Sequence, residues 1–394
     1  MEFLTAAAAP VQQAVEQAGS NPIVAIVAFL LMLGLLVVVH ELGHFLTAIW
    51  MGIKVEEFGV GFPPRAMVLF ERNDVKYTLN WLPIGGFVRF ASHEGAEDNI
   101  YSGGSGTLAA APPLRKIAVM VAGPLMNLLL AMLIFAALFF FMGVPTPTGR
   151  QLIGEVFDAT PAALAGFQAG DELVSLDGRP AVDATVIGEV GRNNLGQPVE
   201  AVVLRDDREV TLVVTPGPWT SPSGAQIESG FGFSYGQDIE MVEAGPIQAA
   251  WTGVTHSFDL LGRMLNALAG LPGAIFGIIS STPSPDGEPI GPVGIARATG
   301  EVIQQPGGFI AFWNLTAVLS LNLFLLNLLP IPALDGSHIV FSVIELLRGG
   351  KKVPPEKEAL VHAIGFAALM GLMLLITVND VMNAIRGNPV LGGS

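Results

Sequence analysis

The sequence contains no cysteine and few charged side chains. Without cysteine, the chain can form neither disulfide bonds nor a thiolate metal site, so any metal must be held by His, Asp or Glu. Only 13% of the 394 residues are charged, against about 25% in an ordinary soluble protein, while 51% are hydrophobic. This combination indicates a membrane protein with a soluble portion and excludes a disordered chain.

Basic residues are especially few: 19 Lys and Arg stand against 34 Asp and Glu, which gives a formal net charge of −15. A nucleic-acid-binding protein needs a basic face, so nucleic acid is not expected as a partner. The tail before the first apolar stretch has no Lys or Arg at all. Because that stretch is also too long for a signal peptide, we expect it to be retained as a membrane span.

Four apolar stretches are each long enough to cross a hydrocarbon core about 30 Å thick, which takes about 20 residues. They predict a polytopic α-helical membrane protein with four transmembrane helices. The expected order is an N-terminal tail and first transmembrane helix (1–50), a cytoplasmic-side β-hairpin loop and linker (51–112), a second transmembrane helix (113–142), an inserted α+β domain (151–216), an extracytoplasmic linker with interfacial helices (217–306), a third transmembrane segment (307–348), a basic cytoplasmic loop (349–357) and a fourth transmembrane helix (358–386).

Basic residues near the spans predict which ends face the cytoplasm, because such residues stay on the cytoplasmic side. Seven of them lie in the loop between the first two spans and its flanks, and four lie in the loop between the last two and its flank. Both termini and the inserted domain are therefore expected outside the cytoplasm. A fifth crossing within 217–306 would spoil this asymmetry, so we expect interfacial or packed helices there.

Residues 151–216 contain short β-rich runs separated by turn signals such as Asp177-Gly178, which predict a small α+β domain. The line TPAALAGFQAGDELVSLDGRP (160–180) resembles the signature of bacterial PDZ domains attached to proteases. A PDZ domain binds an extended peptide as an extra strand at a sheet edge, which makes a peptide the candidate ligand. The alternative is a spacer without a binding function.

The first span carries His40-Glu41-Leu42-Gly43-His44. Four residues make a little more than one helical turn, so both imidazoles project from one face and can bind one Zn²⁺. Each ionisable side chain near the middle of a bilayer costs at least about 2.5–3.5 kcal/mol, so three such groups on one span indicate a ligand. The alternative is a buried hydrogen-bonded cluster or a proton relay.

A catalytic zinc ion needs a third protein ligand and an open position for water. Asp335 follows a helix break at Pro330 and Pro332, and a broken helix at membrane depth is tolerated only where it is buried in protein or lines a cavity. Asp335 is therefore the favoured third ligand, with His338 as its rival. Asp335 is also a candidate cap of the helix that follows it.

Three features together resemble the site-2 protease family of intramembrane zinc metalloproteases, in its bacterial branch with a PDZ domain. They are HELGH in the first span, the PDZ-like domain after the second, and NLLPIPALDG (327–336) in the third, which matches every fixed position of N-x-x-P-x-P-x-L-D-G. MVAGPLMN (120–127) resembles the G-x-x-x-N element of the family's second span, and GPVGIA (291–296) matches a segment that precedes the third.

This resemblance implies an intramembrane zinc endopeptidase that cuts a single-pass membrane-protein substrate within or near its transmembrane segment. The implied cut would follow prior trimming in regulated intramembrane proteolysis, for example of an anti-sigma factor. The implied location is the bacterial inner (cytoplasmic) membrane, with several crossings and with both termini and the PDZ domain outside. Several bacterial members of the family carry two PDZ domains, whereas this sequence has room for one. The identity of the substrate is therefore left open.

The resemblance also implies roles for individual residues. His40, His44 and Asp335 would hold one Zn²⁺ ion together with a water molecule. Glu41 would act as the general base, and Asn327 would hold the substrate backbone. An ordinary hydrogen bond between helices is the alternative for Asn327.

Residues 54–90 resemble the membrane-dipping β-loop that follows the HExxH helix in this family, with β-like runs at 66–70 and 76–81. An exposed edge there would pair with an extended substrate by strand addition. The alternative is a structural hairpin that covers the cytoplasmic side of the site.

Two other functional classes stay open. One is a membrane metal or proton transporter, because intramembrane His and Asp also mark ion paths. The other is a non-catalytic PDZ scaffold, which would need an incomplete set of metal ligands. Replacement of Glu41 by Gln separates a protease from a transporter, since hydrolysis would nearly vanish while zinc stays bound.

Overall fold

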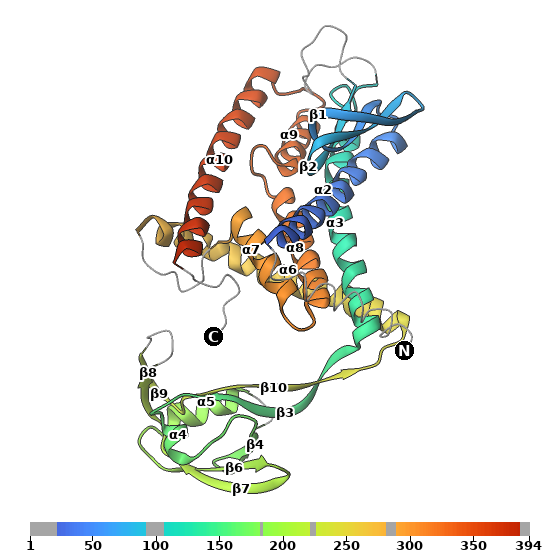
Figure 1. Ribbon diagram of the computed structural model, residues 1–394. Coiled ribbons are helices and arrows are strands. Elements are labelled where there is room, and N and C mark those ends of the chain that lie inside the picture. Colours follow the sequence, from blue (N-terminus) through green and yellow to red (C-terminus); the bar gives the residue numbers. More distant parts are fainter. Residues whose placement is uncertain (1–21, 92–105, 182–183, 221–225, 281–288, 387–394) are drawn as a thin grey trace. The chain divides into compact units, whose positions relative to one another are not determined.

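The computed structural model describes residues 22–91, 106–181, 184–220, 226–280 and 289–386 (Figure 1). The chain divides into two compact units: a helical unit, Met1–Phe141 with Gly245–Gly393, and a sheet unit, Met142–Ala244. The two chain ends, whose sidedness the sequence predicts, lie outside the described residues.

Four of the described helices are long and apolar enough to cross a membrane, which makes the chain a multi-pass membrane protein and confirms the four predicted spans. They are α2 (Pro22–Trp50), α3 (Pro113–Met142), α8 (Gly308–Leu328) and α10 (Pro355–Ile385). The helical unit also contains α6 (Pro246–Ser280), α7 (Pro292–Gln304) and α9 (Asp335–Leu347). Helices α6 and α7 lie in the segment for which the sequence predicts interfacial or packed helices.

Small residues let these helices pack closely. A side-chain carbon at Gly253 of α6 would lie 2.7 Å from the backbone nitrogen of Ala136 in α3. Glycine removes that obstacle and allows the two backbones to approach. Beside this contact, Phe135, Leu261 and Leu321 form part of a buried core between α3, α6 and α8.

The start of α7 is joined to α10 by a carboxylate. Asp380 of α10 accepts hydrogen bonds from the backbone N–H groups of Gly291 (3.3 Å) and Gly294 (2.8 Å). The first N–H groups of a helix have no partner within it, and a negative charge is favourable at that end. The GPVGIA segment therefore attaches the start of α7 to the C-terminal part of α10.

Strands β1 (Val55–Arg72) and β2 (Val75–Phe90) pair to form a sheet in which each strand bends back on itself. Residues 57–60 pair on one side with 76–79 and on the other with 86–89, while 65–72 pair with 75–80. This order leaves two edges. We call residues 86–90, whose Val88 contacts α2, the inner edge, and residues 65–72 the outer edge.

The buried carboxylate of Glu57 binds side chains from both strands of this sheet. Glu57 is 3% exposed and accepts hydrogen bonds from Thr78 Oγ1 (2.7 Å) and Arg65 Nη2 (2.6 Å). Burial by itself would raise the pKa of Glu57, but the hydrogen bonds from Thr78 and Arg65 and the charge of Arg89 hold it below its usual range.

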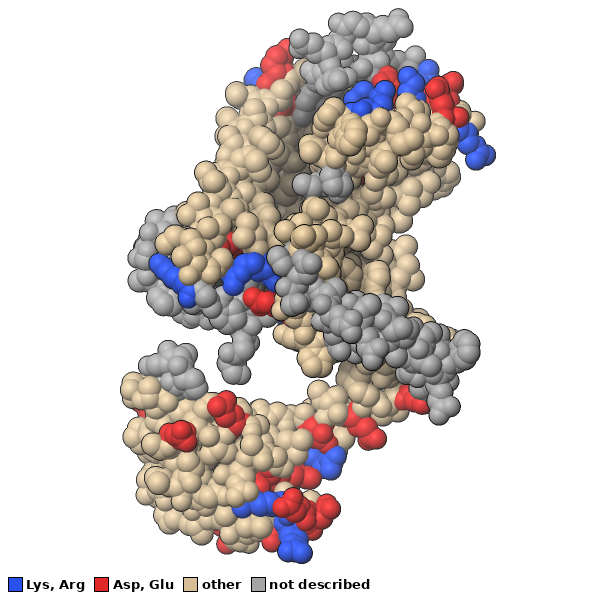
Figure 2. All heavy atoms as spheres, in the orientation of Figure 1, with Lys and Arg blue, Asp and Glu red and all other residues tan. Residues whose placement is uncertain are grey.

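Figure 2 shows Lys and Arg gathered at the end of the helical unit that carries the β1–β2 sheet, while the helical surface next to it is mostly uncharged.

The sheet unit has the strand order β10–β3–β4–β6–β7, with β5 paired to β4. Ile153, Leu173, Val203 and Phe231 belong to its buried core. The elements are β3 (Val144–Val156), α4 (Pro161–Ala165), β4 (Glu172–Leu176), β5 (Arg179–Pro180), α5 (Ala184–Asn193), β6 (Val199–Arg205), β7 (Arg208–Val214), β8 (Gly217–Thr220), β9 (Gln226–Gly230) and β10 (Phe233–Val242).

The structure moves both predicted boundaries of the inserted domain, 151 and 216. Strand β10 pairs with β3 along its whole length, from Phe233 opposite Val156 to Val242 opposite Val144. The unit therefore runs from Met142 to Ala244, and the linker expected from 217 begins only after it. These two strands are far apart in sequence and are not connected by a turn, so no local turn motif predicts their pairing.

Candidate metal centre

The two histidines of α2 face each other, as the HELGH spacing predicts. Their Nε2 atoms are 3.1 Å apart, and the rings meet edge to face with centroids 4.8 Å apart. Both side chains are buried, at 8% exposure for His40 and 6% for His44. A ring nitrogen presents its lone pair in the plane of the ring, so this arrangement lets the two lone pairs converge.

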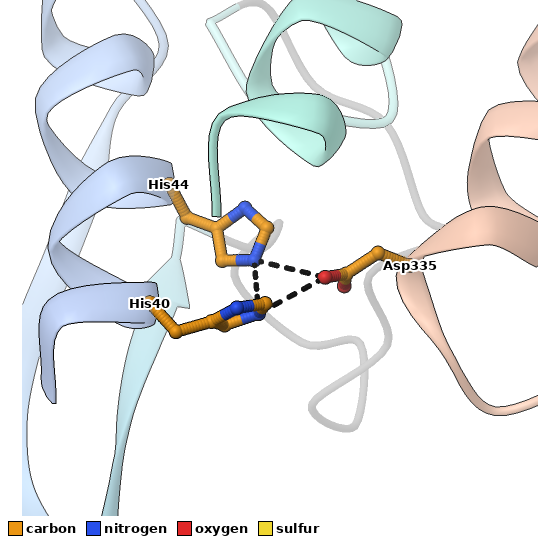
Figure 3. Close-up of side chains that lie close together, drawn as sticks. All are labelled: His40, His44 and Asp335. Carbon is orange, nitrogen blue, oxygen red and sulfur yellow. Dashed lines mark hydrogen bonds and ion pairs between the residues drawn. The ribbon is translucent and has the colours of Figure 1, made fainter. Parts of the chain in front are cut away.

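Asp335 reaches the same point from a distant part of the chain. Helix α8 ends at Leu328, and α9 begins at Asp335 after the turn that holds the two prolines. Asp335 Oδ2 lies 3.0 Å from Nε2 of His40 and 3.3 Å from Nε2 of His44 (Figure 3). The cap position of α9 is Leu334, without a side-chain hydrogen bond, so the carboxylate faces the histidines.

These three atoms fit a tetrahedral metal ion. Zinc binds His nitrogen and carboxylate oxygen at about 2.0–2.2 Å, which places the ligand atoms about 3.3–3.5 Å apart. The separations of 3.0–3.3 Å are close to that requirement. Two imidazoles and one carboxylate are a ligand set of catalytic zinc sites, in which the fourth position stays open for water.

A backbone carbonyl fixes the orientation of His44. Its Nδ1 lies 2.8 Å from the carbonyl oxygen of Val119 in α3. A carbonyl only accepts, so Nδ1 must carry the proton and Nε2 presents its lone pair to the centre. A second hydrogen bond of this kind typically orients a metal-binding histidine.

Asn127 of α3 stands in the same relation to His40. The amide nitrogen Nδ2 of this fully buried residue lies 3.4 Å from Nδ1 of His40. The amide oxygen and nitrogen exchange places by a half rotation. With the oxygen toward the ring, Asn127 accepts the Nδ1 proton of His40 and leaves its Nε2 free for a metal.

Glycines bring α2 and α3 together at this level. A side-chain carbon at Gly43 would lie 2.3 Å from the carbonyl oxygen of Ala122, and one at Gly123 would lie 2.3 Å from Nε2 of His44. Gly123 and Asn127 are thus one turn apart on α3 and contact His44 and His40, which are one turn apart on α2. This geometry explains the G-x-x-x-N spacing.

Glu41 lies beside the inner edge of the β1–β2 sheet. The backbone N–H of Val88 donates to Glu41 Oε2 at 3.1 Å. Gly86, two residues earlier, has no side chain to occupy this space, and a carbon there would lie 3.7 Å from Cγ of Glu41. The sheet edge and the carboxylate next to His40 are therefore in direct contact.

The structure groups His338 with residues of α10 and not with the two histidines of α2. Together with Glu358 and His362 of α10, it forms a second group whose candidate ligand atoms lie within 4.8 Å of one another. The rings of His338 and His362 are stacked, with centroids 4.4 Å apart and planes inclined by 20°. Lone pairs of nearly parallel rings do not converge, so this group is a poor metal site.

Asn327 lies half-buried in the last turn of α8, eight positions before Asp335. Sequence reasoning missed the contacts that Val88, Val119 and His362 make around the centre. The first two act through backbone atoms, which carry no residue signature. Among the residues that contact the two histidines, only Gly123 and Asn127 could be recognised in the sequence, from the G-x-x-x-N spacing.

Comparison with known proteins places this sequence in a family. The sequence profile of peptidase family M50 matches residues 28–372. The chain is 32% identical over 375 residues to a protein of Agrobacterium fabrum that carries the name of a zinc metalloprotease, covering 91% of this chain and 96% of the relative. It is 30% identical to the regulator of sigma-W protease RasP of Bacillus subtilis (90% and 98% covered) and to the zinc metalloprotease RasP of Geobacillus kaustophilus (90% and 97%).

Proposed function

The chain belongs to peptidase family M50 and is an intramembrane zinc metalloprotease of the site-2 type, and from this premise we propose how its residues divide the reaction. His40, His44 and Asp335 hold one Zn²⁺ ion, and Glu41 is the general base. The supporting observation is that one candidate ligand atom from each of these three metal-binding residues lies within 3.3 Å of the other two. Glu41 directly follows His40 in the sequence and is therefore beside this centre.

When bound, zinc would supply a Lewis acid that polarises the scissile carbonyl and lowers the pKa of a bound water toward about 7. The Val88 N–H holds Oε2 of Glu41, which leaves Oε1 to take a proton from the attacking water. Glu41 then passes that proton to the nitrogen of the leaving amine. Val119 and Asn127 keep the two imidazoles in the tautomer that presents Nε2.

The test is Glu41→Gln in the full-length protein. Gln has nearly the same size but cannot take up a proton, so cleavage of a transmembrane substrate should fall by about 10²–10⁴-fold with zinc content unchanged. His44→Ala is the matched control and should lose both zinc and cleavage. Undiminished cleavage by Glu41→Gln would refute its role as the base, and metal or proton flux into vesicles would favour the transporter alternative.

The substrate binds at the inner edge of the sheet. The peptide groups of a transmembrane helix are bonded within that helix, so a segment that unwinds for cleavage needs new partners. An edge strand supplies them by strand addition, and residues 86–90 form such an edge, with Val88 directly beside Glu41. Asn327 both donates and accepts hydrogen bonds and holds the substrate backbone. Asn327→Leu should raise KM for cleavage without changing zinc content.

The substrate is a single-pass membrane protein such as an anti-sigma factor, trimmed before it is cut. This proposal draws on the name of the Bacillus subtilis relative, a regulator of sigma-W protease. The protein lies in a bacterial cytoplasmic membrane. The β1–β2 sheet, with its basic residues, dips into the membrane from the cytoplasmic side, and both termini and the sheet unit lie outside.

The sheet unit is a PDZ domain that takes an extended peptide as an added strand. Strand β10 is the last in the strand order, which leaves it one edge for such a peptide. In the intact protease the unit acts as a size filter that excludes untrimmed substrates.

Excision of residues 146–240 tests the filter. Pro145 and Met241 are paired across β3 and β10, so a two-residue turn can join them. The shortened protein should cut untrimmed substrate faster and trimmed substrate at an unchanged rate. Loss of both activities in a folded, zinc-containing protein would contradict a filter.

A further inference from the structure

The turn that delivers Asp335 has an unfavourable backbone conformation. The N–H of Leu334 donates to the carbonyl oxygen of Ile331 at 3.1 Å, which closes a β-turn with Pro332 and Ala333 at its centre. Ala333 has φ of +75°, in the left-handed region where a side-chain carbon is crowded. A residue is kept there only when its surroundings hold it.

Helix α10 supplies one such hold through His362. The backbone N–H of Ala333 donates to Nδ1 of His362 at 3.1 Å. Ser337 Oγ lies 3.5 Å from the same nitrogen, but its hydroxyl donates to the carbonyl oxygen of Leu334 at 2.7 Å. Nδ1 of His362 therefore serves as the acceptor for the turn.

Gly365, one turn further along α10, supplies the second hold. A side-chain carbon at this position would lie 2.0 Å from Cβ of Pro332 and 3.1 Å from its Cα. The proline ring is rigid and cannot swing aside. Only glycine lets α10 approach the turn closely enough for the hydrogen bond between His362 and Ala333.

Much of the neighbouring surface of α10 faces outward, since Val361, Ile364 and Phe366 are all exposed. The contacts of His362 and Gly365 with the turn are thus confined to one face of the helix. Both residues touch the turn two or three positions before Asp335, whose carboxylate must stay within a few tenths of an ångström of its place to bind a metal.

We propose that the fourth transmembrane helix positions the metal centre, with His362 as a positioning residue that acts through the turn on Asp335. The Nδ1 acceptor of His362 and the missing side chain of Gly365 together fix Pro332 and Ala333, and the turn in turn fixes the carboxylate. This inference rests on the proposed zinc centre. It gives His362 a role as a hydrogen-bond acceptor, in agreement with the stacked, non-converging rings of His338 and His362.

The test compares His362→Asn with His362→Gln in the full-length protein. Asn places an oxygen the same number of bonds from the backbone as Nδ1 of histidine, whereas the oxygen of Gln lies one bond further. We measure zinc retention against a competing chelator and cleavage of a transmembrane substrate. His362→Asn should stay near wild type, while His362→Gln should lose about 10–100-fold in zinc affinity, the usual effect of removing an outer partner of a metal ligand.

Gly365→Ala should show the same loss of zinc affinity. Gly371→Ala is its matched control on the same helix, because a side-chain carbon at Gly371 meets nothing within 4 Å. Melting temperatures of the zinc-free proteins identify any variant that fails to fold, and the Asn and Gln pair then decides. Wild-type zinc affinity in both His362→Gln and Gly365→Ala, or an equal loss in His362→Asn and His362→Gln, would overturn the proposal.

Failure of the zinc centre itself gives a different result. In that case the wild-type protein would hold no stoichiometric zinc, or Glu41→Gln would cut normally. The comparison of His362 variants refutes the positioning role only where wild type binds zinc and cuts.

Discussion

Alanine at position 123 would place a methyl group against the metal-facing side of His44. The new carbon would lie 2.3 Å from Nε2, 2.5 Å from Cε1 and 2.8 Å from Cδ2 of that ring. Carbon and ring atoms in contact need about 3.5 Å, so the ring must move by about 1 Å. Metal–ligand distances tolerate only about 0.2 Å.

We therefore expect Gly123→Ala to weaken zinc binding by at least about 100-fold, or about 2.8 kcal/mol. The overpacking of α2 against α3 should add a loss of about 1–3 kcal/mol in the free energy of unfolding. Zinc affinity is measured by chelator competition in detergent. Stability is compared between zinc-free proteins, so that the contribution of the metal is not counted twice.

Gly262→Ala in α6 is the control, since a carbon there meets nothing within 4 Å. It should bind zinc and cut like wild type. If Gly123→Ala also bound zinc with wild-type affinity, the inferred contact between α3 and His44 would be wrong.

Three further predictions concern other parts of the molecule. Removal of zinc by a chelator should lower the melting temperature and re-addition should restore it, because a ligand at 1,000 times its Kd stabilises the folded state by about 4 kcal/mol. Glu57 has a lowered pKa in the folded state, so its contribution to stability is present above the unfolded pKa of about 4.3 and is lost as the pH falls through the folded value. In Glu57→Gln the melting temperature should fall less steeply below about pH 4 than in wild type. If variant and wild type lost melting temperature equally in this acidic range, this role of Glu57 would be excluded. Asp171 is 2% exposed and binds Arg205 through two bonds of 2.7 Å. Asp171→Ala should cost the sheet unit about 2–3 kcal/mol, less than a fully buried pair because the guanidinium is partly exposed, measured by hydrogen exchange of β4 and β6 in the full-length protein.

The parts of this structure that could be predicted are those with a local periodic signal. The spacing of His40 and His44 predicts that both face one side of α2, and the prolines before Asp335 predict the helix break. The approach of the two segments needed the additional argument that intramembrane charges must find partners. That argument favours Asp335 over His338, in agreement with where the structure places each side chain.

Contacts made by backbone atoms and by strands far apart in sequence could not be predicted in the same way. Val88 approaches Glu41 through its N–H, which every residue except proline has. The pairing of β10 with β3 joins strands separated by most of the sheet unit. His362 looks like an ordinary polar residue near the start of a span until the turn at Ala333 lies beside it.

Helix α10 is fastened to its neighbours at two points that lie on opposite halves of its length, His362 on the turn at Ala333 and Asp380 on the start of α7. From 362 to 380 is 18 residues, or about 27 Å at 1.5 Å per residue. Five turns of α-helix behave almost as a rigid rod. A displacement of the start of α7 would therefore be transmitted along α10 to the turn that precedes Asp335.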